Sequence, residues 1–471
     1  MLYDYIIVGG GISGLYLAYE LLKMKGPCKL ILLEKGTRLG GRVFTYSDSY
    51  MTVDTGAGRF NEKHLLFMKL LKELGLDHKK IKNGNSAAHY HIDVHGNSHF
   101  MNSILDFGST DSTTISTDSI NTENLQFSRK GFIQPIEDMT LDIWQGKEVL
   151  PNVGIIVRLI IASKMVSKTR LISMSFVTFA KTVLSKEELD FLLGSFGYYS
   201  ELVLMNAYDC LHLIMELDPK NQFYSLSGGL SLVIRELEKR ILKMGGILHT
   251  RKHVTHIHEI HIHEISDSIS AYEVSGKDFS YKGTHLICAL TKQAISSLSF
   301  FRPILPLIQK IKSAPLCRIY AKYPVSKKNG VWFRGLSKFT VNNELRMVIP
   351  ISEKDGVIMI AYMDNKYAEF WQTIFEKGGE KGLHQELKRL ISLTTNIDIP
   401  DAIEVRAFYW EYGVGYWGPG ADSEKISELI AHPFADKKVY ICNENFSSKF
   451  QQWMEGSLDS ASRVLRFLYT L

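Results

Sequence analysis

The sequence predicts a mixed α/β protein in which a Rossmann-like dinucleotide-binding domain is interleaved with a second domain. Three segments predict the first domain. Residues 3–34 read as strand, glycine-rich turn, helix and strand, residues 225–246 place a second glycine pair before an amphipathic helix, and residues 439–468 add a strand and another such helix. The 471 residues, 45% of them hydrophobic, are enough for more than one core.

The first segment has the spacing of a dinucleotide-binding turn. A β-branched and aromatic run ends at Val8, and Gly9, Gly11 and Gly14 follow it directly. Gly9 permits the tight turn, Gly11 lets the backbone approach a pyrophosphate, and Gly14 lets the next helix pack closely on the sheet. That helix directs its free N–H groups at the phosphates. Glu34 ends the second strand about 20 residues later, where an acidic side chain can bind a ribose.

The residues after Glu34 indicate which dinucleotide is bound. Gly40 and Gly41 precede Arg42, whose guanidinium can reach the pyrophosphate with forked donors. From this point the chain resembles the flavin-containing amine oxidases, a family that includes monoamine, polyamine and L-amino-acid oxidases. The resemblance is strongest at the two ends and weak between about residues 85 and 222. It implies FAD as the cofactor instead of NAD.

The resemblance also implies a domain arrangement. An FAD-binding Rossmann-like domain of the two-dinucleotide-binding type would be interleaved with an α+β substrate domain. We expect the FAD-binding domain to comprise residues 1–85, 223–290 and 405–471. We expect the substrate domain to comprise residues 86–222, mainly helical, and residues 291–404, with a sheet and helices. Residues 103–124 are rich in Ser, Thr, Asp and Asn and are expected to form a flexible insertion.

The stretch at residues 53–60 contains Gly58 and Arg59, which suit close approach to a flat ring beside a fixed cation. It resembles the L-amino-acid oxidase version of the family, in which an arginine here pairs with the substrate carboxylate. The alternative is that Arg59 binds the flavin or a surface carboxylate. Amino-acid oxidases also present a tyrosine from a strand that aligns with residues 346–350, and this sequence has no tyrosine there.

Near the C-terminus, residues 410–417 resemble the monoamine oxidase segment that ends in a flavin-linking cysteine. Tyr416 stands at the cysteine position, so the resemblance implies non-covalent FAD. Trp417 and Trp453 match the two walls of the family's aromatic sandwich, which excludes water and orients the amine. The alternative is that both tryptophans are ordinary core residues.

A further catalytic position follows from the same resemblance. Most family members hold a water against the flavin N5 atom with a lysine, and Arg318 is the counterpart here, with Lys322 close by. Buried lysine can lose its charge, whereas arginine stays protonated. The exchange is therefore expected to change proton handling and oxygen reactivity.

Three more cofactor positions are carried over from the family. Val254 stands where the adenine-contacting valine is expected. Glu444 matches the final cofactor glutamate, although Asn443 replaces the usual glycine before it. Met454 begins a helix whose positive end would stabilise the reduced flavin.

Composition and charge limit the partners and the compartment. A net charge of +5, from 55 Lys and Arg against 50 Asp and Glu, does not favour nucleic acid. Five scattered cysteines without metal spacing are expected to be reduced, which predicts a cytoplasmic protein. A strand that begins at residue 3 leaves no room for a signal peptide, and the sequence ends at Leu471 without an apolar tail, so we expect no membrane anchor.

Five histidines lie within eleven residues, at 253, 256, 258, 261 and 263. Neighbouring pairs on one strand face could bind a metal ion. We favour a solvated hairpin and predict no metal.

The expected reaction is oxidation of the C–N bond of a primary or secondary amine or an L-amino acid to an imine, with dioxygen reoxidising the flavin to give hydrogen peroxide. The sequence does not decide whether the protein forms a homodimer. A catalytically impaired FAD-binding protein with a binding or regulatory role is an alternative, which Arg318 and Asn443 favour. A flavin desaturase on the same fold is another, and the paired tryptophans argue against it.

Overall fold

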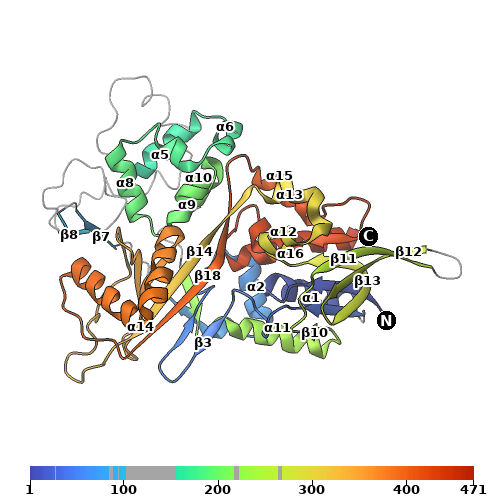
Figure 1. Cartoon of the computed structure of the whole chain (residues 1–471), viewed down its shortest axis with the longest axis horizontal. Coiled ribbons are helices and arrows are strands. Elements are labelled where there is room, and N and C mark those ends of the chain that lie inside the picture. The colour runs from blue at the N-terminus through green and yellow to red at the C-terminus, as the bar shows by residue number, and fades with distance from the viewer. Residues whose placement is uncertain are drawn as a thin grey trace. The chain divides into compact units, whose positions relative to one another are not determined.

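The computed structural model describes residues 1–26, 28–83, 88–93, 95–101, 155–216, 222–263 and 268–470 (Figure 1). The chain forms two compact units. The first comprises Met1–Asn83, Asn221–Pro315 and Trp410–Leu471, and the second comprises Gly84–Lys220 and Leu316–Tyr409. The predicted flexible insertion at residues 103–124 lies outside the described residues.

The first unit is built on a sheet with strand order β10-β2-β1-β13-β12-β11, and β19 pairs with β13. The strands are β1 (Leu2–Val8), β2 (Leu30–Leu33), β10 (Ile247–His249), β11 (His256–His263), β12 (Ser268–Gly276), β13 (Phe279–Cys288) and β19 (Val439–Ile441). β10, β2, β1, β13 and β19 run parallel, whereas β11 and β12 form an antiparallel meander. Because β1 and β2 are parallel neighbours, α1 (Ile12–Lys25) has to cross between them.

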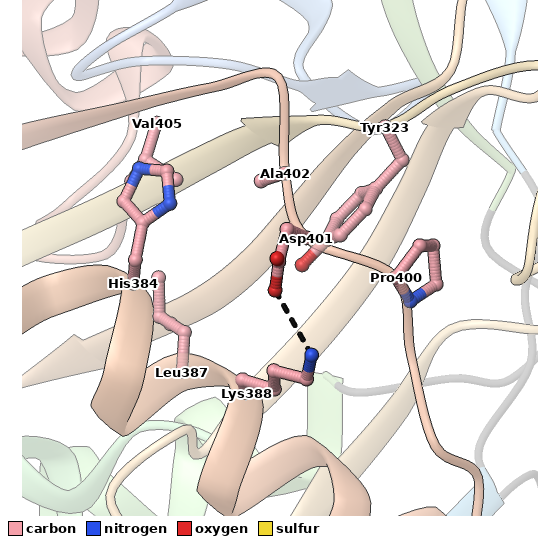
Figure 2. A pocket seen from close by; sticks show the side chains of 8 residues that line it. All are labelled: Tyr323, His384, Leu387, Lys388, Pro400, Asp401, Ala402 and Val405. Atoms are coloured by element: carbon pink, nitrogen blue, oxygen red, sulfur yellow. Dashed lines mark hydrogen bonds and ion pairs between the residues drawn. The ribbon is translucent and has the colours of Figure 1, made fainter. Parts of the chain in front are cut away.

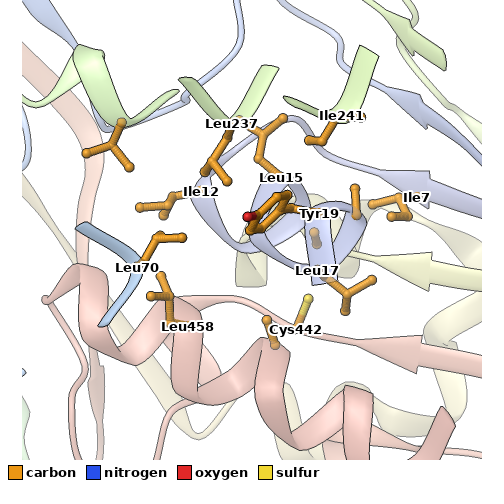
Figure 3. Packing of buried hydrophobic residues seen from close by; sticks show 14 of the residues in the cluster. Ile7, Ile12, Leu15, Leu17, Tyr19, Leu70, Leu237, Ile241, Cys442 and Leu458 are labelled. Atoms are coloured by element: carbon orange, nitrogen blue, oxygen red, sulfur yellow. The ribbon is translucent and has the colours of Figure 1, made fainter. Parts of the chain in front are cut away.

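One face of this sheet is covered by α1, α2 (Leu65–Glu73), α11 (Ser231–Lys243) and α16 (Met454–Thr470). Figure 3 shows Leu15 and Leu17 of α1 packing with Leu237 of α11 and Leu458 of α16, all fully buried. The apolar spacing predicted for residues 225–246 and 439–468 therefore marks the buried sides of α11 and α16.

The other face carries α12 (Lys292–Ser297), the 3₁₀ helix η4 (Ser299–Ile304), α13 (Leu305–Ile308) and α15 (Ser423–Ala431). Ile295, Phe301 and Ile308 are fully buried in one cluster with Ile6 and Leu286 of the sheet. This packing keeps the chain in the first unit up to residue 315, whereas the sequence predicted a boundary after residue 290.

Three small strand pairs complete the first unit. β3 (Thr45–Ser47) pairs with β4 (Thr52–Asp54). β9 (Phe223–Leu226) pairs with both β5 (Phe60–Asn61) and β6 (Lys80–Lys82).

The second unit has a sheet with the order β18-β14-β17-β16-β15-β7-β8. Its strands are β7 (Ala88–Ile92), β8 (Ser98–Met101), β14 (Ile311–Lys322), β15 (Phe339–Val341), β16 (Met347–Ser352), β17 (Val357–Asp364) and β18 (Glu404–Trp417). The residues of β14 up to Pro315 and those of β18 from Trp410 belong to the first unit. Its helices are α5 (Ile155–Lys164), α6 (Lys168–Ser173), α7 (Phe176–Ala180), α8 (Lys186–Ser195), α9 (Tyr199–Leu204), α10 (Ala207–Glu216) and α14 (Asn365–Thr395). α14 bends at Gly379, which has a φ of 57°, and its Trp371 and Ile391 pack on Ile319 of the sheet.

The histidine-rich segment forms β11, paired residue by residue with β12. His256 and His258 are exposed with their rings 6.3 Å apart, whereas Ile257, between them in sequence, faces the core with Val274 of β12. Across the residues that the structure describes, no group of three or more His, Cys, Asp or Glu side chains is arranged to hold a metal ion. None of the described helices is both long and apolar enough for a bilayer span.

Candidate functional site

The glycine turn after β1 has two glycines that no other residue could replace and one that faces open space. A Cβ on Gly9, which has a φ of +111°, would lie 2.3 Å from the carbonyl oxygen of Ala289, and a Cβ on Gly14 would lie 2.1 Å from that of Gly9. A Cβ on Gly11 would meet nothing within 4 Å. The backbone at Gly11 is therefore open to a ligand at the N-terminus of α1, which is where an anion is bound most readily.

Glu34 lies at the end of β2 and braces this turn. Its Oε2 accepts the N–H of Gly10 at 2.8 Å, and its Oε1 accepts the N–H of Gly36 at 2.7 Å. A carboxylate offers about four acceptor positions. Glu34 can therefore hold the turn and still accept hydrogen bonds from a ribose.

The segment that carries Arg42 lies directly against the glycine turn. The N–H of Gly40 donates to the carbonyl of Gly10 at 2.8 Å, and a Cβ on Gly41 would lie 3.6 Å from the Cα of Gly11. The backbone of the next residue, Arg42, therefore begins beside the open turn, although the two segments are separated by α1 and β2 in sequence.

Glu444 holds Arg42 in place. Arg42 Nη2 lies 2.7 Å from Glu444 Oε2, and its Nη1 donates to the carbonyl of Gly413 at 3.0 Å. The two Glu444 oxygens also accept from Asn445 Nδ2 at 2.8 Å and from the N–H of Gln452 at 2.6 Å. The Glu444 side chain is 5% exposed against 24% for Arg42, so Arg42 is the member open to a ligand and Glu444 positions it.

Asn443, which replaces the family glycine, fits its position without backbone strain. Its φ of −176° is extended backbone that any residue adopts. Its Oδ1 accepts from Arg42 Nη2 at 3.3 Å and from the N–H of Asn445 at 3.1 Å. Asn443 therefore adds to the Arg42 contacts, and the exchange is not a sign of a damaged site.

Trp417, predicted to be one wall of the aromatic sandwich, is buried in the first unit. Only 1% of its surface is exposed, and its ring packs in the core with Ile426 and Val439. Its indole N–H donates to the carbonyl of Ser447 at 2.8 Å. The role of Trp417 as one wall of an aromatic sandwich therefore stays a prediction. Tyr416 is equally buried.

Trp453 lies instead in an aromatic cluster around Arg59. The Phe223 and Trp453 rings stack with centroids 6.0 Å apart and an interplanar angle of 25°. The Arg59 Cζ atom lies 4.6 Å from the Phe223 centroid and 5.7 Å from that of Trp453. Arg59 and Trp453 are both half-buried, so this cluster combines a fixed cation with an accessible indole.

His64 closes the cluster on the edge of Trp453. The centroids of the His64 and Trp453 rings are 4.8 Å apart, with an interplanar angle of 62°. The Nδ1 atom of His64 accepts the N–H of Asn61 at 3.4 Å. Burial, and then the charge of Arg59, lower the pKa of His64 to about 4. His64 is therefore neutral at physiological pH. Sequence reasoning missed both His64 and Phe223, and the only signal was their aromatic character at the ends of short polar stretches.

Glu455 of α16 caps α2, so it links the two helices that directly follow His64 and Trp453. Its carboxylate oxygens accept the N–H groups of Leu66 and Phe67, both at 2.9 Å, in the first turn of α2. His64 immediately precedes α2 and Trp453 immediately precedes α16, so this cap fixes the distance between them.

The remaining predicted cofactor residues also belong to the first unit. Gly58 is half-buried next to Arg59. Val254 is 7% exposed and lies two residues after Lys252, whose N–H donates to the carbonyl of Glu34 at 2.8 Å. Met454 is 5% exposed and begins α16. The predicted cofactor positions thus all come from segments of one compact unit.

Arg318 belongs to the second unit, on β14 opposite Tyr362 of β17. It is 5% exposed, its Nη2 donates to the Tyr362 hydroxyl at 3.2 Å, and its Cζ lies 4.4 Å from the Tyr362 ring centroid. Burial lowers the pKa of Arg318, but Tyr362 and Tyr320 raise it further, so the net pKa is above the usual value and the charge is retained. Residues 346–350 contain no tyrosine, but Tyr362 of β17 pairs with Met347 in that stretch. A tyrosine is therefore present on the neighbouring strand.

A pocket in the second unit holds none of these residues (Figure 2). Its rim includes the ion pair between Lys388 Nζ and Asp401 Oδ1, 2.9 Å apart, and the buried Tyr323 lies beside it. The Asp401 side chain is 87% exposed and that of Lys388 is 42% exposed, and such surface pairs contribute little to stability. We assign it no role in the chemistry.

Comparison with known proteins gives a family match over most of the chain. The family described as "Flavin containing amine oxidoreductase" matches residues 12–464. A flavin-containing amine oxidase of Oncorhynchus mykiss is 37% identical over 89 residues, and an L-amino acid oxidase of Cerastes cerastes is 36% identical over 89 residues. These alignments cover 19% and 18% of this chain but only 17% of each relative's length.

Solved structures show the same fold over the whole chain. Cyclohexylamine oxidase from Brevibacterium oxydans IH-35A has a TM-score of 0.67 at 16% identity, and a putrescine oxidase bound to putrescine has a TM-score of 0.70 at 15% identity. Both comparisons cover 100% of this chain and of the other chain. They show a mixed α/β fold shared with flavin-dependent amine oxidases.

Proposed function

Because the chain belongs to the family of flavin-containing amine oxidoreductases, we propose that it uses FAD to oxidise the C–N bond of an amine or L-amino acid to an imine, with dioxygen reduced to hydrogen peroxide. The observation that carries this proposal is the placement of the Arg42 segment on the glycine turn. It brings the backbone of this segment next to the open backbone at Gly11, and a buried carboxylate holds the Arg42 guanidinium.

The residues of the first unit suit an FAD molecule. Gly11 and the N-terminus of α1 would receive the pyrophosphate together with Arg42, and Glu34 would bind the adenosine ribose. Val254 would contact the adenine, and the positive end of α16 at Met454 would face the flavin. When bound, FAD supplies the acceptor for the two electrons removed from the substrate.

We propose that the FAD is held without a covalent bond. Tyr416, at the position of the family's linking cysteine, has no thiol and is 1% exposed in the core. A phenol ring so enclosed cannot reach a ligand without moving the end of β18.

Arg59 and Trp453 are the proposed substrate-binding residues. The guanidinium of Arg59 is planar and permanently charged, so it suits a charge-assisted, bidentate pair with a carboxylate. A plain amine arrives as an ammonium at neutral pH and would be repelled by the same charge. This favours L-amino acids over the matching amines. Trp453 would exclude water and orient the amine nitrogen.

Arg318 is the proposed catalytic residue of the second unit. Because Tyr362 helps to keep it charged, it would provide a fixed positive charge and would not exchange protons. Water orientation and oxygen reactivity would then depend on a permanent cation, in place of a lysine that can titrate.

A direct test uses the purified protein. We expect a yellow protein that releases intact FAD on acid precipitation, and bleaching of the bound flavin by some members of a panel of L-amino acids and their decarboxylated amines under anaerobic conditions. Admission of air should restore the colour with one hydrogen peroxide per imine formed. A colourless protein that fails to take up added FAD would overturn the proposal.

The second candidate is an FAD-binding protein that has lost turnover. The burial of Trp417 favours it, because a ring that is 1% exposed offers a substrate little surface. In that case the protein would bind FAD, but no amine or amino acid would bleach it. Burial of Trp417 also weakens the argument against a desaturase, which would reduce the flavin without releasing ammonia.

A further inference from the structure

We propose that Phe223 and His64 are positioning residues that fix Arg59 and Trp453 as one rigid recognition unit for the polar end of the substrate. This inference rests on the proposed function, since it concerns the same site. It adds two residues that no motif in the sequence indicated.

Backbone pairing fixes the position of Phe223, and the Phe223 ring contacts the Arg59 guanidinium. It begins β9 and pairs with Asn61 of β5, two residues after Arg59. Its ring stacks on Trp453 at 6.0 Å and lies 4.6 Å from the Arg59 Cζ atom. Because β5 and β9 are hydrogen-bonded to each other, the backbone segments that carry the Phe223 ring and the Arg59 guanidinium are held together. Phe223 therefore fixes the direction in which Arg59 presents its donors.

His64 performs the matching task for Trp453. It is 2% exposed, so its ring has no freedom to turn away from the indole edge. Phe450 supports it from another side, with ring centroids 6.0 Å apart. A neutral imidazole also leaves Arg59 as the cation that the substrate meets, whereas a lysine or arginine at this position would add a second buried charge.

The backbone around the four side chains is itself locked. Glu455 caps the first turn of α2, and the N–H of Trp453 donates to the carbonyl of Phe450 at 3.2 Å. Removing a ring should therefore loosen one neighbour without unfolding the unit. This separates a positioning role from a general role in the core.

The test compares ring removal with ring conservation. Phe223→Leu removes the ring, Phe223→Tyr keeps it, and His64→Asn removes the imidazole but retains a residue type that caps helices well. Phe434→Leu is the matched control, because Phe434 packs with Phe300 and Phe301 on the other face of the sheet. For each protein, KM and kcat are measured with an L-amino acid and its decarboxylated amine.

We expect Phe223→Leu to raise KM for the amino acid about 2- to 30-fold, the range for a lost cation–π contact, with a smaller change in kcat. Phe223→Tyr should restore the wild-type KM, and Phe434→Leu should leave it unchanged. Equal KM changes for the amino acid and the amine would overturn the role of Phe223.

Trp453 fluorescence gives a readout that does not depend on turnover. In the FAD-free protein, subtracting the emission of the same variant with Trp453→Phe isolates this indole. We expect lower anisotropy and a red shift in Phe223→Leu and His64→Asn, but not in Phe434→Leu. Unchanged Trp453 emission in both site variants would overturn the inference. If the wild-type flavin is reduced by no substrate, the proposed function fails, and the fluorescence result still decides the positioning role.

Discussion

The pair between Arg42 and Glu444 allows a stability prediction that can be worked out from the contacts. In Glu444→Gln the side chain keeps its size but loses its charge. One Glu444 oxygen accepts from Arg42 and Asn445, and the other accepts from Gln452. A glutamine amide has one oxygen, so either orientation turns its NH₂ group toward a donor.

Two costs follow from this substitution. Arg42 loses its charged partner, and at least one buried donor loses its acceptor. Breaking a buried ion pair by removing one partner costs about 3–5 kcal/mol, and because 24% of the Arg42 side chain stays exposed we expect about 3 kcal/mol. The matched control is Glu428→Gln. Glu428 pairs with Arg463 at 3.3 Å but is 55% exposed, so its loss should cost less than about 1 kcal/mol.

The assay is urea unfolding of the FAD-free proteins followed by tryptophan fluorescence, with FAD titration of the folded proteins alongside. Glu444→Gln should unfold at a clearly lower urea concentration than wild type. It should also bind FAD more weakly, because the Arg42 guanidinium is no longer held by a charged partner. If Glu444→Gln were as mild as Glu428→Gln in both measurements, Glu444 would not position Arg42 and the reasoning would fail.

Three further predictions concern the Arg59 cluster and Trp417. Arg59→Ala should slow flavin reduction by an L-amino acid, because losing the charged partner costs about 2–5 kcal/mol of binding energy. Reduction by the matching amine should slow far less. Equal losses for both substrates in anaerobic stopped-flow would mean that Arg59 serves the flavin instead. Trp453→Ala should retain FAD but slow flavin reduction, whereas Trp417→Ala should lower the thermal unfolding temperature through a core loss of about 3–5 kcal/mol. The folded-state pKa of His64, about 4, lies below the unfolded value, so its contribution to stability is present above about pH 6.5 and is lost as pH falls toward 4. His64→Asn should flatten this part of the stability profile, and an unchanged profile would contradict it.

The dinucleotide-binding part of the fold could be predicted because its signals are local. A buried strand, the demands of Gly9 and Gly14 on the backbone, and the apolar spacing of α11 and α16 depend on residues close together in sequence. Arg42 could be named for the same reason, since its segment follows the second strand directly. The family resemblance then supplied the cofactor, and the match over residues 12–464 agrees with it.

The tertiary structure alone decided which side chains face the core and which segments meet. Trp417 matched a motif position, but the end of β18 is buried on both faces, and a motif does not report which face of a strand is covered. Residues 291–315 could not be assigned to a domain from the sequence, because their apolar side chains would suit either core. In the structure, side chains of this stretch pack in one cluster with Ile6 and Leu286 of the first unit. Phe223 is brought to Arg59 by strand pairing, and Trp453 is brought there by the helix cap at Glu455. These residues are separated by more than 150 positions in the sequence, and contacts at such separation produce no periodic pattern that could predict them.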